Sequence, residues 1–198
     1  MYSINEYNNL TSKYGRFASW AIWDNRNESD TIIISKNMKD LHSRFVLLGL
    51  NVSSILKGTN WMNFRGGSHD RKIKFASNDT QLRGSYITDI FKDLPEVNSN
   101  KIDKILTKEL IEFNVKFFKQ EMKDIKVNDK TIFIIFGYKA QKYFNLYFKQ
   151  GYKNQIIFQR HYSSRGTDKE WVESFWEKMN INQNFDLTIE KYRLSKGL

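Results

Sequence analysis

The chain has 198 residues, which suits one domain and is enough to bury a sizeable core. Hydrophobic residues make up 40% of it and aromatic residues 15%, which excludes a disordered tail, and no apolar run approaches the roughly 18 residues needed to cross a bilayer. The absence of cysteine excludes disulfides, thiolate metal sites and iron–sulfur clusters. Because the amino terminus lacks a secretory pattern, we expect a cytoplasmic monomer without membrane contacts.

The net charge of +10 is concentrated in two segments. Residues 57–74 carry five basic groups against one acid, and residues 131–165 carry six basic groups and no acid. The aromatic residues interleaved with these basic groups are Trp61, Phe64, Tyr138, Tyr143, Tyr147 and Tyr152. This pattern favours a surface that follows phosphates and stacks bases over a merely solvated basic face.

The first half of the chain contains two strand candidates. The first thirty residues are polar and aromatic, and we expect them to cover the core. A β-branched run predicts a strand over 31–35, and an apolar run predicts a buried strand over 45–51 that ends in Gly-Leu-Asn. No periodicity appears between 53 and 79, and a segment of this length is typical of functional loops or short helices.

The second half alternates strands and helices. Strands are predicted over 84–91, 131–136 and 154–159. Helices are predicted over 103–126 and 138–148, and a third after Asp168 as its cap. The alternation predicts an α/β fold, a three-layer α/β/α sandwich with a mainly parallel sheet of four to five strands, as a single domain over 1–198.

Two short motifs follow the first and the last of the buried strands. They are Gly49-Leu50-Asn51-Val52-Ser53 and His161-Tyr162-Ser163-Ser164-Arg165-Gly166. In this order they resemble the two motifs of the uracil-DNA glycosylase superfamily, in its mismatch-specific and single-strand-selective monofunctional branch. The segments 61–64, 86–90 and 136–140 are similar to the family's intervening segments, so that the resemblance extends over 45–180.

The resemblance implies a site at which a base is removed from DNA after it has been flipped out or presented on a single strand. Asn51 would hold the attacking water through its carboxamide, and His161 would donate a hydrogen bond to the charge on the departing base. Stacking of Phe64 on that base would be worth about 1–3 kcal/mol. The residues implied to bind the base are Gly49, Leu50, Phe64 and Asp89, and those implied to bind DNA are Ser53, Lys57, Arg65, Ser163, Ser164 and Arg165. No metal or cofactor is implied, and the motifs contain no Schiff-base lysine, which favours base release without strand cleavage.

Several positions depart from the family pattern. Val52 and Tyr162 replace prolines that would preset the two loops, and Ser53 stands where a glycine is usual. Asp89 stands where some relatives carry asparagine, and an ionised aspartate accepts from N3–H of uracil but repels O4. Either the pocket protonates Asp89, or it prefers a base with a donor at that edge, or the side chain turns away into a backbone turn.

The function expected from these residues is a DNA-repair glycosylase that hydrolyses the N-glycosidic bond of uracil or of a related deaminated or mismatched base. The alternative is a glycosylase-fold protein that binds nucleic acid with weakened or lost turnover. A metal-dependent nuclease or phosphatase fits less well, because the chain has three histidines and no tight Asp/Glu cluster. The charge distribution gives no support to a small-molecule binding protein.

Overall fold

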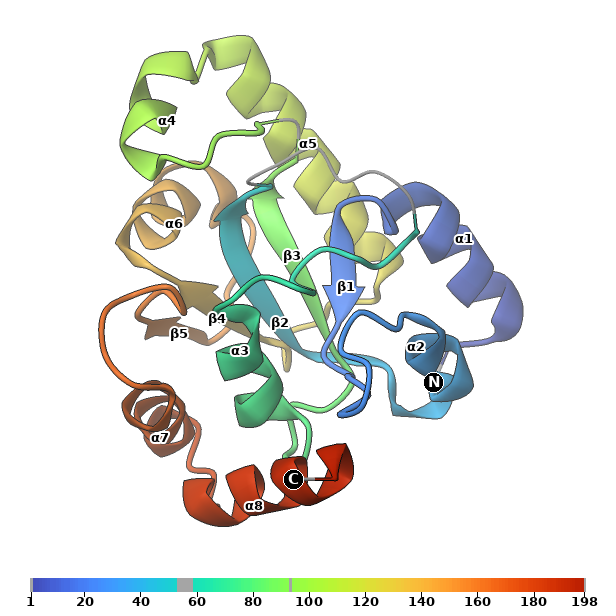
Figure 1. Cartoon of the computed structure of the whole chain (residues 1–198). Helices are drawn as coiled ribbons and strands as arrows, with labels where there is room; N and C mark the ends of the chain where they lie inside the picture. The colour runs from blue at the N-terminus through green and yellow to red at the C-terminus, as the bar shows by residue number, and fades with distance from the viewer. Residues whose placement is uncertain (1, 53–58, 93, 198) are drawn as a thin grey trace.

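One five-stranded sheet organises the molecule (Figure 1). The structure is a computed structural model that describes residues 2–52, 59–92 and 94–197. The strands are β1 (Ala18–Trp20), β2 (His42–Asn51), β3 (Ser85–Phe91), β4 (Ile132–Phe136) and β5 (Ile156–Gln159). Their order is β1-β3-β2-β4-β5, and all neighbours are parallel except β1, which runs antiparallel to β3. The chain leaves β2 for β3 on one side and later reaches β4 on the other, so the carboxyl end of β2 lies where open α/β sheets bind ligands.

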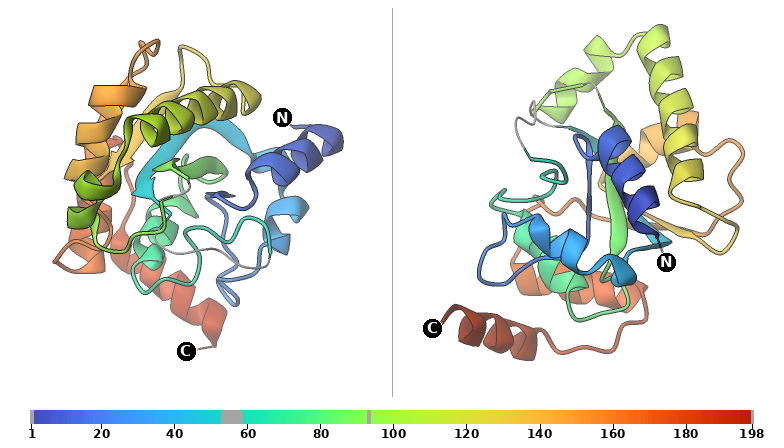
Figure 2. Two further views of the ribbon diagram at one scale, coloured as in Figure 1. Left: turned by 90° about the horizontal axis from the view of Figure 1, so that it is seen from above. Right: turned by 90° about the vertical axis from the view of Figure 1, so that its right-hand side faces the viewer.

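Helices cover both faces of the sheet and complete a three-layer α/β/α sandwich (Figures 1 and 2). One face packs against α1 (Ile4–Tyr14), α5 (Lys108–Asp124), α6 (Tyr138–Tyr143) and the π-helical turn η2 (Phe144–Phe148). The other face packs against α3 (Asp70–Ser77), α7 (Asp168–Lys178) and α8 (Phe185–Lys196). The shorter elements are α2 (Ile32–Lys36), the 3₁₀ turn Met38–Asp40 and α4 (Ser99–Ile105). None of the helices in the described ranges combines the length and the apolar character required to span a bilayer.

The residues of β2 alternate between two cores. Val46, Leu48 and Leu50 pack on the α1 and α5 side, whereas Phe45 and Leu47 pack on the α3 and α7 side. Successive side chains of a strand point to opposite faces, so a strand covered on both sides must be apolar at every position. This double burial explains the uninterrupted apolar run in the sequence.

The predicted sandwich and the four main strands are confirmed, but the amino-terminal prediction is wrong in part. The segment predicted as a strand over 31–35 is the helix α2. The backbone N–H of Ile32 donates to Asp30 Oδ1 over 2.8 Å. Ile34 is the one fully buried residue of α2, and Ile33 packs against the core as a partly buried side chain. Here local capping and tertiary contacts override the β propensity of isoleucine. The elements α1, β1 and α8 were not predicted.

Two helix predictions also need correction. The helix predicted over 103–126 is divided into α4 and α5, because Thr107 Oγ1 accepts from Leu110 N and starts a new helix. The cap of α7 is Thr167 rather than Asp168, and it forms a capping box with Glu170. The predicted helix over 138–148 is present, with its second half in π-helical geometry.

Candidate active site

Asn51 ends β2 at the carboxyl edge of the sheet, with its side-chain nitrogen fully engaged. Nδ2 donates to Leu94 O over 2.7 Å, to Glu96 O over 2.8 Å and to Val52 O over 3.3 Å. Three carbonyl acceptors fix the orientation of the carboxamide, since the flipped amide would set oxygen against oxygen. Within the described ranges no group donates to Oδ1, so this oxygen remains an acceptor for a ligand or a water.

Asp89 lies on β3 directly beside Gly49, its register partner on β2. The carboxyl group is 3% exposed, and its Oδ2 accepts from Asn63 Nδ2 over 2.8 Å. A Cβ on Gly49 would collide with Asp89 Oδ1 and lie 3.1 Å from Phe64 Cζ, so only glycine allows this contact. Burial raises the pKa of Asp89 to about 7, although the hydrogen bond from Asn63 and the charge of Lys92 act in the opposite direction. The side chain therefore lies against Gly49, Phe64 and Asn63 and does not turn away into a backbone turn.

Phe64 forms a wall of this site through a strained loop. Trp61 and Phe64 have φ angles of 67° and 61°, which non-glycine residues rarely adopt and which often mark functional sites. The ring of Phe64 meets the edge of Tyr162 at a centroid distance of 6.2 Å, and only 5% of Phe64 is exposed. It is thus a packed ring in this structure, not the open stacking surface expected from the sequence.

His161 follows β5 at the same edge of the sheet. Its Nδ1 accepts from Ser163 N over 3.1 Å and lies 2.6 Å from Ser163 Oγ, so we assign the ring proton to Nε2. Burial lowers the pKa of His161 to about 4, with a contribution from His69, and the ring is therefore neutral near pH 7. The ring stacks on Tyr162 at 4.2 Å, and a Cβ on Gly137 would lie 3.1 Å from His161 Cβ. The neutral ring can donate one hydrogen bond from Nε2.

The two predicted catalytic residues lie at one edge of the sheet and are linked by a chain of contacts. Asn51 lies two residues beyond Gly49, whose Cα approaches the ring of Phe64, which meets Tyr162 beside His161. Phe64 and Tyr162 thus form the series of contacts that joins the end of β2 to His161.

The loop after His161 is held from beneath by a buried lysine. Lys72 on α3 is 2% exposed, and its Nζ donates to Ser164 O and to Gly166 O, both over 3.3 Å. Ser163 and Arg165 are exposed, as expected for residues that contact DNA, whereas Ser164 Oγ is buried without a partner in the described structure. The sequence placed Lys72 in a basic surface, and the structure instead makes it an anchor of this loop.

Two predicted site residues, Arg65 and Leu50, are buried and make structural contacts instead. Arg65 is 7% exposed, and its guanidinium donates to Ser19 Oγ and to the carbonyls of Trp20, Ile22, Glu28 and Asp30. A guanidinium enclosed in this way cannot contact a phosphate, which corrects the DNA-binding prediction for Arg65. Leu50 packs its side chain into the α1 and α5 core and so cannot contact a base with it. Ser53 and Lys57 lie outside the described residues.

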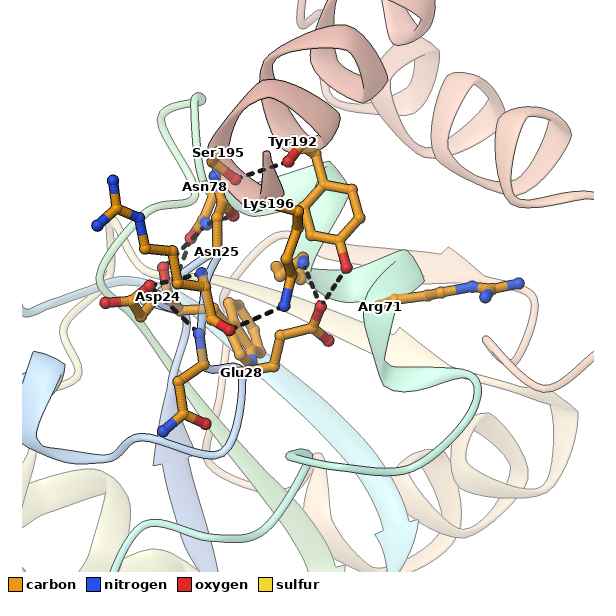
Figure 3. Close-up of polar contacts among 12 residues, drawn as sticks. Asp24, Asn25, Glu28, Arg71, Asn78, Tyr192, Ser195 and Lys196 are labelled. Carbon is orange, nitrogen blue, oxygen red and sulfur yellow. Dashed lines mark hydrogen bonds and ion pairs between the residues drawn. The ribbon is translucent and has the colours of Figure 1, made fainter. Parts of the chain in front are cut away.

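The first basic segment is largely internal. Lys74 is buried, and its Nζ lies 2.8 Å from Glu28 Oε1, which also accepts from Tyr192 OH over 2.8 Å. Figure 3 shows Glu28 reaching Tyr192 of α8 from the loop that precedes α2. Arg71 pairs with Asp168 over 2.6 Å. Three of the four basic residues described in this segment are thus buried, and the fourth, Arg71, is exposed but paired, which corrects the expectation of a phosphate-binding surface there.

The second basic segment remains at the surface. Lys149, Lys153, Arg160 and Arg165 are exposed and have no carboxylate within 4 Å among the described residues. Two other cations of this segment pair with Asp103, which also accepts from Tyr143 OH. Tyr138, which follows Gly137 at the sheet edge, is exposed as well. Arg160 and Arg165 flank His161 in the chain, so these two cations and the exposed ring of Tyr138 fit contact with a nucleic-acid backbone. Lys149 and Lys153 precede β5 and lie toward the opposite edge of the sheet.

Sequence reasoning missed the positioning role of Asn63. Its carboxamide donates to Phe17 O over 2.7 Å and to Asp89 Oδ2, and its Oδ1 accepts from Phe64 N over 3.1 Å. Its place beside the candidate stacking residue was the only signal in the sequence. Within the described ranges no three His, Asp or Glu side chains are grouped so as to hold a metal ion.

Comparison with known families adds no assignment to this geometry. No protein-family model matches the chain, and no curated protein matches it.

Proposed function

We propose that the chain is a monofunctional N-glycosylase that removes uracil or a related deaminated or mismatched base from DNA. The observation that carries the proposal is the pairing of an oriented carboxamide with a neutral imidazole at one sheet edge. Asn51 Oδ1 is free to accept because Nδ2 is fixed by three carbonyls, and His161 Nε2 is free to donate because Nδ1 is occupied.

The reaction follows from these two groups. A water held by Asn51 Oδ1 attacks C1′ of the sugar as the C1′–N bond breaks, and the bonding electrons leave with the base. His161 Nε2–H donates to the base oxygen on which negative charge develops, without transferring its proton. The base takes up a proton from solvent, and the water loses one as the hydroxyl forms on C1′. No covalent enzyme intermediate and no lysine are needed.

Asp89 is the candidate reader of the base edge. Its Oδ2 is occupied by Asn63, and Oδ1 lies against Gly49 and Phe64. In its protonated form the carboxyl group can donate to O4 of uracil, which an ionised carboxylate would repel. This supports uracil among the candidate bases at pH values below the pKa of Asp89.

Oligonucleotides that contain uracil, hypoxanthine, xanthine or a G·T mismatch, followed by alkali cleavage, test the proposal. We expect an abasic product from at least the uracil substrate. The Asn51→Ala and His161→Ala variants should each lose about 10²–10³-fold in rate, as is usual when one stabilising donor is removed from a site. Absence of abasic product from single- and double-stranded substrates would exclude a glycosylase.

The packing of Phe64 favours a second candidate, a protein of this fold that binds nucleic acid without turnover. Its ring is enclosed by Tyr162 and is not open to a base. This candidate predicts salt-sensitive DNA binding by the exposed cations near His161 and no base release. An anisotropy titration alongside the cleavage assay distinguishes the two candidates.

A further inference from the structure

An apolar groove runs along α5 and shares no lining residue with the candidate active site. Its volume is about 950 Å³, and it extends from α5 to the π-helical turn η2. Ile111, Val115 and Tyr147 line it as half-buried side chains. Phe113 is 49% exposed and Leu146 is 59% exposed. Grouped exposure of large apolar side chains is typical of interaction sites.

The π-helical turn is what presents Leu146. Phe144 and Phe148 are both buried, and Lys149 N donates to Phe144 O over 2.8 Å, which closes the wider turn. In this geometry the residues between the two phenylalanines bulge outward, and Leu146 projects into the groove. Such single π turns are rare and occur frequently at functional sites. The exposure of Leu146 is thus built into the backbone.

The charge along the groove is predominantly positive. Lys116, Lys119 and Lys123 are exposed, and among the described residues none has a carboxylate within 4 Å. Their spacing of three and four residues aligns them along one face of α5. The single acid of the lining, Glu112, already lies 3.8 Å from Lys108. A ligand that neutralises the lysines must therefore carry its own acidic groups.

We propose that the α5 groove binds an acidic amphipathic helix of a partner protein. Apolar side chains of such a helix at i, i+3 or i+4, and i+7 would fill the groove, and carboxylates at the same spacing would meet the three lysines. Aliphatic walls made by Ile111, Val115 and Leu146 suit this ligand, whereas a nucleic-acid backbone gains nothing from them. A second copy of the chain fits poorly, because α8, which exposes Leu187 and Leu194, has three basic residues against two acidic ones.

A synthetic peptide provides the test. The probe is a fluorescein-labelled helical peptide of about 18 residues, with a leucine stripe at helical spacing flanked by glutamates. One control peptide has the same composition in scrambled order, and another carries lysine in place of glutamate. We expect the probe to bind the full chain at least about tenfold more tightly than either control, and less tightly as salt is raised.

Variants of exposed residues locate the binding. Leu146→Ser, and separately Lys116→Glu with Lys119→Glu, should each weaken binding of the probe about tenfold or more. The matched controls are Leu194→Ser on α8, and Lys36→Glu with Lys39→Glu, which reverse two exposed lysines at the same spacing; they should bind as wild type. Because all of these side chains are exposed, the variants should fold, as circular dichroism will verify.

Four results would overturn the proposal. They are equal binding of the scrambled or the lysine peptide, wild-type binding by the groove variants, displacement of the probe by an equimolar DNA duplex, and a dimer in light scattering that Leu146→Ser dissociates. The last two would assign the groove to nucleic acid and to a second copy.

Discussion

Substitution of Asp89 by asparagine tests the central electrostatic feature of the site. The carboxyl group is almost fully buried, and burial raises its pKa from the ordinary 3.8 to about 7. Asparagine has the same shape, keeps an oxygen to accept from Asn63 and cannot ionise. The substitution therefore removes one titration and leaves the packing in place.

The expected change in unfolding free energy follows from the difference between the pKa of Asp89 in the folded and in the unfolded chain. The folded-state pKa lies above the unfolded value, so the folded chain binds more protons between about pH 4 and pH 7, and stability falls as the pH rises through that range. A difference of about three pH units corresponds to about 4 kcal/mol. His161 and His42 act with the opposite sign, because burial lowers both pKa values to about 4 and stability rises with pH between about 4 and 6.5. Only the difference between wild type and the Asp89 variant isolates the carboxyl group.

Urea unfolding of both proteins from about pH 4 to about pH 8 measures that difference. We expect the free energy of unfolding of Asp89→Asn to rise relative to wild type by about 4 kcal/mol across this range. Asp129→Asn, at an exposed position, serves as the matched control and should give a constant difference. A constant difference for Asp89→Asn as well would mean that the carboxylate is ionised in the folded protein, and the argument from burial would fail.

Four further substitutions test the surroundings of the site. Gly49→Ala places a Cβ against Asp89 and should abolish base release, with a loss of about 1–3 kcal/mol in unfolding free energy; wild-type activity would disprove the close contact. Lys72→Met should change the unfolding free energy by less than about 2 kcal/mol, because a buried ammonium without a carboxylate partner among the described residues is costly to keep. Base release by this variant should nevertheless fall, because the loop after His161 loses the hydrogen bonds that Lys72 donates to it. Arg65→Met should lower the unfolding free energy in urea by about 3–5 kcal/mol, and its folded fraction should bind DNA as tightly as wild type. Arg165→Met, at an exposed position, should keep the unfolding free energy of wild type and bind DNA more weakly in an anisotropy titration.

Strands that are buried on both faces could be predicted from the sequence where they form a short, uninterrupted apolar run. The run that becomes β4 is an example, since it is five residues long and apolar throughout. The isoleucines of α2 form a run of the same kind and became a helix, because only Ile34 is fully buried and Asp30 accepts from the backbone N–H of Ile32 at the start of the helix. A local pattern cannot reveal whether a sheet has room for another strand.

The position of Asn51 and His161 at the carboxyl edge of the sheet was predictable, because one ends and the other follows a strand that the sequence reveals. Which lysines and arginines are buried was not predictable, because burial of a charge depends on partners that lie far away in the chain. Lys74 meets Glu28, and Arg65 meets carbonyls of residues 20–30. A count of charges along the sequence cannot separate such internal ion pairs from an exposed cationic surface.

Val52 and Tyr162 stand where the family resemblance leads us to expect proline, and contacts hold both residues in place. Val52 N donates to Phe91 O over 3.3 Å, a hydrogen bond that a proline could not make and that continues the pairing of β2 with β3. Tyr162 is held by an edge contact with Phe136 at 5.9 Å and by its stack on His161. Both residues are thus held by contacts instead of by a fixed φ angle. Under the proposed function, a base that enters between Phe64 and Tyr162 would break the edge contact of these two rings. Because Tyr162 also stacks on His161, we then expect base entry and movement of the loop after His161 to occur together.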